Sequence, residues 1–107
     1  MKKASILIDK SQSLLNGRFV LKIKVLRVKK DEKYPDGIKA KFAMLDIEKQ
    51  IIRLLIDNHE PWGYHIHPYL PEDHSVRTRI GAKDYQEAAN IFFKEVQKVI
   101  KNETKKN

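Results

Sequence analysis

The sequence contains no cysteine, which excludes disulfide bonds, thiolate metal ligands and cysteine nucleophiles. Its apolar runs are short, and none approaches the roughly 20 residues that a membrane-spanning helix needs. The opening residues, MKKASILIDK, hold an apolar run too brief for a secretory signal. These absences predict a cytoplasmic protein that has no membrane partner.

Acidic side chains are comparatively few: 14 Asp and Glu stand against 22 Lys and Arg, a formal net charge of +8. Such a surplus attracts polyanions such as RNA, DNA or an acidic protein. A lysine-rich surface that is merely solvated accounts for the same composition. The length of 107 residues and the apolar content of 41% indicate one folded domain. We place this domain at residues 1–102 and expect a disordered basic tail at 103–107.

The first half of the chain alternates apolar with polar residues, which is the period of a β-strand. We expect strands at residues 6–8, 18–30, 37–45 and 51–57. The connections are short and include Pro-Asp-Gly at residues 35–37, which favours an antiparallel meander. Because the apolar phase slips after Val25, a β-bulge is expected at Val25–Leu26.

The last segment, residues 84–102, has the spacing of an amphipathic helix. Its apolar positions are Tyr85, Ala88, Ala89, Phe92, Val96, Val99 and Ile100. Asp84 followed by Glu87 forms a capping-box pattern at the start of this helix. The sequence therefore predicts an α+β domain, in which a curled antiparallel sheet of about five strands is covered by one C-terminal helix.

Histidine is concentrated in one segment: NHEPWGYHIHP, residues 58–68, holds three of the four imidazoles in the chain. If GYHIHP is extended, its side chains alternate between two faces. His65 and His67 then stand side by side on an exposed face, while Tyr64 and Ile66 anchor in the core.

A second extended stretch, SVRTRI at residues 75–80, places Arg77 and Arg79 on one face. If this strand neighbours the histidine strand, the two arginines complete a surface patch with His65 and His67. Imidazoles exchange protons near neutrality, and guanidinium groups bind phosphate and stabilise the charge that develops on it. The patch therefore predicts metal-independent cleavage of an RNA phosphodiester. Its candidate catalytic residues are His65, His67, Arg77, Arg79, His59 and His74.

Contacts to RNA beyond this patch are expected from lysines on the polar faces of two strands and from aromatic rings that stack on bases. The candidate nucleic-acid-binding residues are Lys22, Lys24, Lys39, Lys41, Trp62 and Tyr69. One alternative is a basic module that holds nucleic acid or a protein without turnover. Another is a solvated lysine face that has no partner at all.

The histidines have further interpretations that the sequence leaves open. The acid–base mechanism needs no cofactor, but His65 and His67 are suitable ligands for a divalent metal ion, and His74, His59 or a nearby acid could complete the site. A structural role, in which a ring nitrogen hydrogen-bonds a loop backbone, is a second alternative, and contact with a partner protein is a third. Asp57 could orient an imidazole, but an Asp-Asn pair after an apolar strand more often closes a turn, which is the role we favour.

Three stretches together resemble a known group of small prokaryotic proteins. LLIDNH, GYHIHP and FFKEVQKVI follow one another, within roughly residues 18–101, as in the toxins of TumA/TumE toxin–antitoxin pairs. Where that family tends to have R-Y-D-N, this chain has LIDN. The resemblance implies a growth-inhibiting toxin that is neutralised by a helix-turn-helix antitoxin encoded beside it. The resemblance thus adds the antitoxin to the expected partners, beside the RNA that the patch and the charge predict and the possible second copy of the chain.

Overall fold

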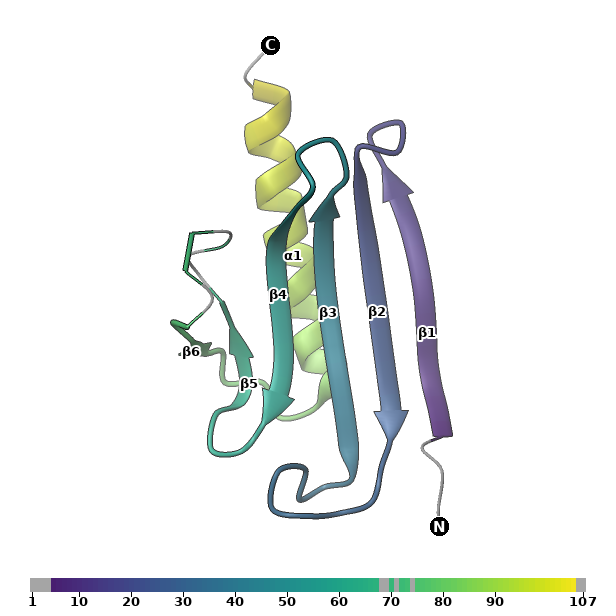
Figure 1. Ribbon diagram of the computed structural model, residues 1–107, viewed down its shortest axis with the longest axis vertical. Coiled ribbons are helices and arrows are strands. Elements are labelled where there is room, and N and C mark those ends of the chain that lie inside the picture. The colour runs from purple at the N-terminus through teal and green to yellow at the C-terminus, as the bar shows by residue number, and fades with distance from the viewer. Residues whose placement is uncertain (1–4, 68–69, 71, 74, 106–107) are drawn as a thin grey trace.

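A computed structural model describes residues 5–67, 70, 72–73 and 75–105 of the chain. The described residues form six strands and one helix, joined in a simple meander in which each strand pairs with the next (Figure 1). The elements are β1 (Ser5–Leu14), β2 (Phe19–Arg27), β3 (Ile38–Asp46), β4 (Ile51–His59), β5 (Gly63–Ile66), β6 (Thr78–Arg79) and α1 (Tyr85–Lys105). All neighbouring strands are antiparallel. The predicted α+β fold is confirmed, with six strands in place of about five.

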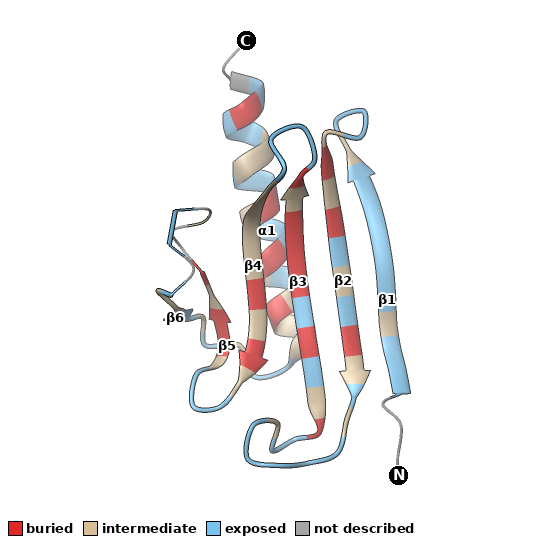
Figure 2. Cartoon of the chain, viewed as in Figure 1, coloured by how far each residue is buried: buried red, intermediate tan, exposed pale blue. Residues whose placement is uncertain are grey.

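The helix covers one face of the sheet and runs behind β3 and β4 in the view of Figure 1. Every apolar position predicted for α1 packs in or against the core, and the rings of Phe42 and Phe92 lie 5.7 Å apart. Burial is concentrated in β2, β3 and β4, whereas β1 at the edge is largely exposed (Figure 2). The opposite side of the sheet, which α1 does not cover, is called the helix-free face below.

Both ends of α1 are fixed by side chains. At its start, the Oδ1 atom of Asp84 accepts a hydrogen bond from the N–H of Glu87 at 2.9 Å, which confirms the predicted cap. At its end, the helix continues to Lys105, so the disordered tail expected at 103–107 is wrong for residues 103–105. The reason is Glu103, which is only 8% exposed and pairs with Arg18 at 3.2 Å and with Arg53 at 3.1 Å. Residues 106 and 107 lie outside the described residues.

The bulge expected in β2 is also wrong, because β2 pairs with β3 without any shift of register. The extra residue is Leu7 in the edge strand β1, since Ile6 lies opposite Leu26 while Ile8 lies opposite Val25. An edge strand accommodates a bulge at little cost, because it has a neighbour on one side only. Among the described residues, no helix combines the length and the apolar character that crossing a lipid bilayer requires.

Candidate functional site

The strand register places one polar side chain from each strand in a single row across the helix-free face. Residues directly opposite one another in an antiparallel sheet point to the same side. The opposed pairs are Asp9–Lys24, Lys24–Lys41, Lys41–Asp57, Asp57–His65 and His65–Arg79. We call these six residues the polar row. The basic strands and the histidine segment therefore belong to one continuous surface.

His65 is the most buried member of the polar row, with no exposed surface. Its Nδ1 atom lies 2.8 Å from the carbonyl oxygen of Gly63, and its Nε2 atom lies 2.5 Å from the Oδ1 atom of Asp57. The rings of His59 and His67 approach the His65 ring with centroid distances of 4.9 and 5.3 Å. Burial lowers the pKa of His65; the Gly63 carbonyl and Asp57 oppose this effect, while the two neighbouring imidazoles add to it.

The alternation predicted for GYHIHP is confirmed, but the exposure of its imidazoles is not. Tyr64 and Ile66 pack into the core beneath α1, and the rings of His65 and His67 lie side by side on the other face. The two rings are 0% and 6% exposed, so the prediction of an open surface pair is wrong. A physical reason is that His59 and Trp62 pack against His65, with the Trp62 ring centroid 6.5 Å from the His65 ring centroid.

The arginine strand does lie beside the histidine strand, which is the condition that the predicted patch required, although only Thr78 and Arg79 pair with β5. The two guanidinium groups contact Pro61 and Trp62, in the turn between β4 and β5. The Nη2 atom of Arg79 donates a hydrogen bond to the Pro61 carbonyl oxygen at 2.8 Å, and the Cζ atom of Arg77 lies 5.8 Å from the centre of the Trp62 ring. The remaining predicted residues, Tyr69 and His74, lie outside the described residues.

Asp57 and Asn58 do not close a turn, because β4 continues through His59. The two side chains instead take opposite faces of β4. Asp57 has a side chain that is 28% exposed and faces His65. Asn58 is buried, where its Oδ1 accepts from the Ala40 N–H at 2.7 Å and its Nδ2 donates to the Ile38 carbonyl at 2.9 Å. The favoured turn interpretation is therefore wrong, and Asn58 has a structural role that the sequence did not indicate.

No family model, curated protein or solved structure matches this chain.

The side-chain atoms around His65 limit the chemistry that this part of the helix-free face supports. Asp57, His65 and His67 each present one ligand atom, and these three atoms all lie within 4.8 Å of one another. A carboxylate and two imidazoles that converge in this way bind a proton or a metal cation. We call these three residues the Asp57/His65/His67 triad.

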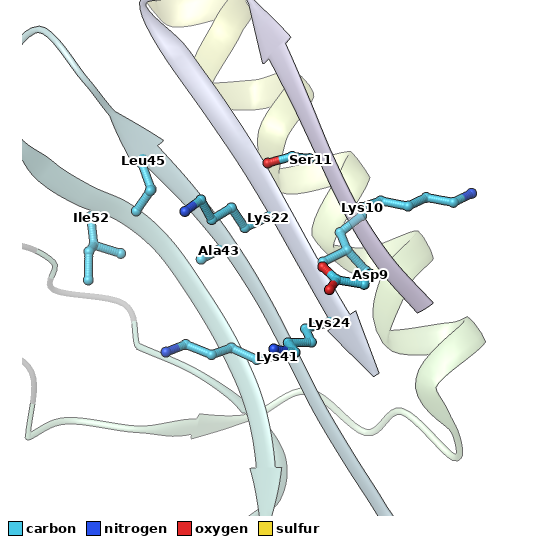
Figure 3. Close-up of a pocket in the computed structure, with 10 residues that line it drawn as sticks. Asp9, Lys10, Ser11, Lys22, Lys24, Lys41, Ala43, Leu45 and Ile52 are labelled. Atoms are coloured by element: carbon cyan, nitrogen blue, oxygen red, sulfur yellow. The ribbon is translucent and has the colours of Figure 1, made fainter. Parts of the chain in front are cut away.

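The lysines predicted to contact nucleic acid lie on the same face, at the other end of the polar row. Lys22, Lys24 and Lys41 line a hollow of about 410 Å³ (Figure 3). The other residues around this hollow are Asp9, Lys10, Ser11, Ile23, Ala43, Leu45 and Ile52. Lys39 is exposed opposite Leu26, outside the hollow. Sequence reasoning missed Asp9 and Ser11, because it predicted only residues 6–8 of β1 and residues 9–13 are all polar, with no alternation to indicate a strand.

Proposed function

We propose that the protein binds RNA across its helix-free face and acts as a growth-inhibiting toxin of the type its sequence resembles. The observation that supports RNA binding most directly is the opposed pair Lys24–Lys41. Like charges directly opposite one another destabilise a sheet. No ion pair among the described residues engages either lysine. The phosphates of a polyanion would remove this repulsion, with release of counterions.

The shape of the lysine hollow suits a sugar–phosphate backbone. Three ammonium groups, on Lys22, Lys24 and Lys41, surround a hollow that also has apolar lining from Ala43, Leu45 and Ile52. Lys24 and Lys41, which lie between Asp9 and Asp57 in the polar row, thus bind phosphates, and the row continues to Arg79. Trp62, which is 37% exposed, is available to stack on an unpaired base. Single-stranded RNA therefore fits the surface better than a duplex, whose bases are already stacked.

The toxin proposal is supported by where the three family-like stretches lie. LLIDNH ends in β4 and GYHIHP begins in β5, and these two stretches contribute the Asp57/His65/His67 triad. FFKEVQKVI lies in α1, whose Phe92 belongs to the core that Tyr64 also enters. Cleavage of RNA by His65 and His67 stays a prediction. Both residues are buried, and His59 and Trp62 would have to move before a substrate reaches the His65 ring.

A direct test is the binding of a fluorescent single-stranded RNA oligonucleotide at several salt concentrations, followed by anisotropy. The triple variant Lys22→Gln, Lys24→Gln, Lys41→Gln removes three positive charges from the hollow. We expect weaker binding and a slope of log K against log salt that is shallower by about 2, because each lost phosphate contact on a single strand reduces it by about 0.7.

A matched control removes the same charge from the opposite side of the molecule. Lys94→Gln, Lys98→Gln, Lys101→Gln changes three exposed lysines on α1, which covers the other face of the sheet. This control should retain the wild-type slope and most of the affinity. Equal losses in the two triple variants, or no RNA binding by the wild type at low salt, would overturn the proposed function.

A further inference from the structure

The proton of the His65 ring is placed by its backbone contact. A carbonyl oxygen accepts hydrogen bonds and never donates them. Because Nδ1 lies 2.8 Å from the Gly63 carbonyl oxygen, the proton is on Nδ1, and neutral His65 keeps a lone pair on Nε2. Histidine ligands of metal ions are oriented in this way, with the second ring nitrogen donating to a carbonyl or a carboxylate.

The Nε2 atom of His65 is buried and makes no hydrogen bond within the described part of the chain, and the same holds for the Oδ1 atom of Asp57. These two atoms nevertheless face each other at 2.5 Å. Two atoms that both present lone pairs repel at this separation unless a cation lies beside them. A cation beside both atoms removes this repulsion, and the ligand atom of His67, within 4.8 Å of both, makes a metal ion a suitable cation.

His67 supplies the third ligand of such a site. Its ring lies 5.3 Å from that of His65, and the ligand atoms of the triad are all within 4.8 Å of one another. Two ligands of one tetrahedral ion, at metal–ligand distances near 2.1 Å, are about 3.4 Å apart. Binding therefore requires that Asp57 and His65 separate slightly while the widest gap in the triad closes, and rotation of these side chains accomplishes both.

The donor set limits the ion. Two imidazole nitrogens and one carboxylate oxygen, without any thiolate, match the first-row divalent metals and match Ca²⁺ and Mg²⁺ poorly. Zn²⁺ forms catalytic sites with three protein ligands of this kind and leaves its fourth position for water. The partly exposed side chain of Asp57 provides the approach from solvent. His59, although it packs on His65, is not a member of the triad.

We infer that Asp57, His65 and His67 form a binding site for one divalent transition-metal ion, with Zn²⁺ as the best match. Asp57 thus completes the site as the nearby acid that the sequence left open beside His74 and His59. The site goes beyond RNA binding and does not depend on it, since the lysines of the hollow contribute no ligand.

The test is isothermal titration of untagged, EDTA-treated protein with Zn²⁺, with Ni²⁺ and Mn²⁺ as comparison ions. We expect one Zn²⁺ per chain for the wild type, binding at least about tenfold weaker for His65→Gln and His67→Gln, and tighter binding of Zn²⁺ than of Mn²⁺. Asp57→Asn has nearly the shape of the native residue, so it tests the carboxylate ligand even if a histidine variant fails to fold. Co²⁺ substitution, read by visible absorption, reports the coordination geometry.

His59→Gln is the matched control, because it removes a neighbouring imidazole from outside the triad. It should bind Zn²⁺ like the wild type. The inference is overturned if the wild type binds no Zn²⁺, if Asp57→Asn binds it as tightly as the wild type, or if His59→Gln weakens binding as much as the triad variants do. The triple lysine variant should retain Zn²⁺ binding while losing RNA binding, so the two proposals fail separately.

Discussion

The side chains of Asp57 and His65 meet because the two residues lie directly opposite each other on β4 and β5. A slip of one residue in this pairing would turn His65 toward the helix and Tyr64 toward the helix-free face. The burial of Tyr64 and Ile66 in the core opposes such a slip. The geometry of the triad is therefore a consequence of apolar packing on the other side of the same strand.

The metal-free protein should lose stability as the pH falls. Burial lowers the pKa of His65 from its ordinary value of 6.5, so the unfolded chain takes up the proton first. The contribution of His65 is then fully present above about pH 6.5 and is lost as the pH falls through the lower pKa of the folded state. Urea unfolding in EDTA, measured between about pH 7.5 and pH 5, should show this loss in the wild type and a flatter dependence in His65→Gln. Parallel curves for the two proteins would contradict the assignment.

Asn58→Ala should destabilise the fold without touching the polar row. It removes the acceptor of the Ala40 N–H and the donor to the Ile38 carbonyl. A buried N–H left without a partner costs about 1–3 kcal/mol, and each kcal/mol lowers the melting temperature of a domain of this size by about 4–8 °C. Thermal unfolding measures this loss. Asn90→Ala, at an exposed helix position, is the control and should not lower the melting temperature.

Much of the fold followed from two periodicities in the sequence. The alternation in β2 and β3 indicates which face of each strand is apolar, and the spacing of Phe92 and Val96 does the same for α1. Both patterns involve only residues that are close in the sequence. The pairing of β5 with β6 could not be predicted in this way, because the connection from Ile66 to Thr78 is long. The side chains that each face of a strand presents could therefore be predicted from the sequence, whereas their contacts could not.

The burial of the histidines could not be predicted, because it depends on contacts between residues that alternation does not describe. His59 covers His65 from the end of β4, and Trp62 covers it from the turn between β4 and β5. Arg77 reaches the Trp62 ring from the segment before β6. The extent of α1 was missed for a similar reason. Glu103 lies in a polar stretch that looks frayed by composition, and its pairing with the distant residues Arg18 and Arg53 is a property that composition does not show.

Glu103→Gln should therefore destabilise the end of the helix. The change removes the charge that pairs with both Arg18 and Arg53 at a position that is 8% exposed. The contact from Arg53 is a charge-assisted hydrogen bond, and such bonds contribute about 1.5–3 kcal/mol, so the loss should be visible in urea unfolding. Glu95→Gln breaks the exposed pair with Lys98 and should cost about 0–1 kcal/mol. Equal effects of the two changes would show that Glu103 is not held as described.

Growth inhibition should depend on both the lysine hollow and the buried residues His65 and His67. Expression of the wild type should arrest growth of a bacterial host, and co-expression of the antitoxin expected from an adjacent gene should restore it. His65→Ala and His67→Ala should abolish the arrest if the cluster acts on a target, whereas the triple change at Lys22, Lys24 and Lys41 should weaken it if the hollow binds that target.

The charge-matched α1 variant with glutamine at positions 94, 98 and 101 should remain toxic, since it leaves the helix-free face intact. The amount of soluble protein and its circular dichroism spectrum must be compared for every variant, because a variant that fails to fold loses toxicity whatever the role of the changed side chain. A folded double variant His65→Ala, His67→Ala with full toxicity would remove the enzyme interpretation and leave RNA binding alone as the source of inhibition. Full toxicity of the triple lysine variant would instead place the target away from the hollow, because three of its cations would then be dispensable.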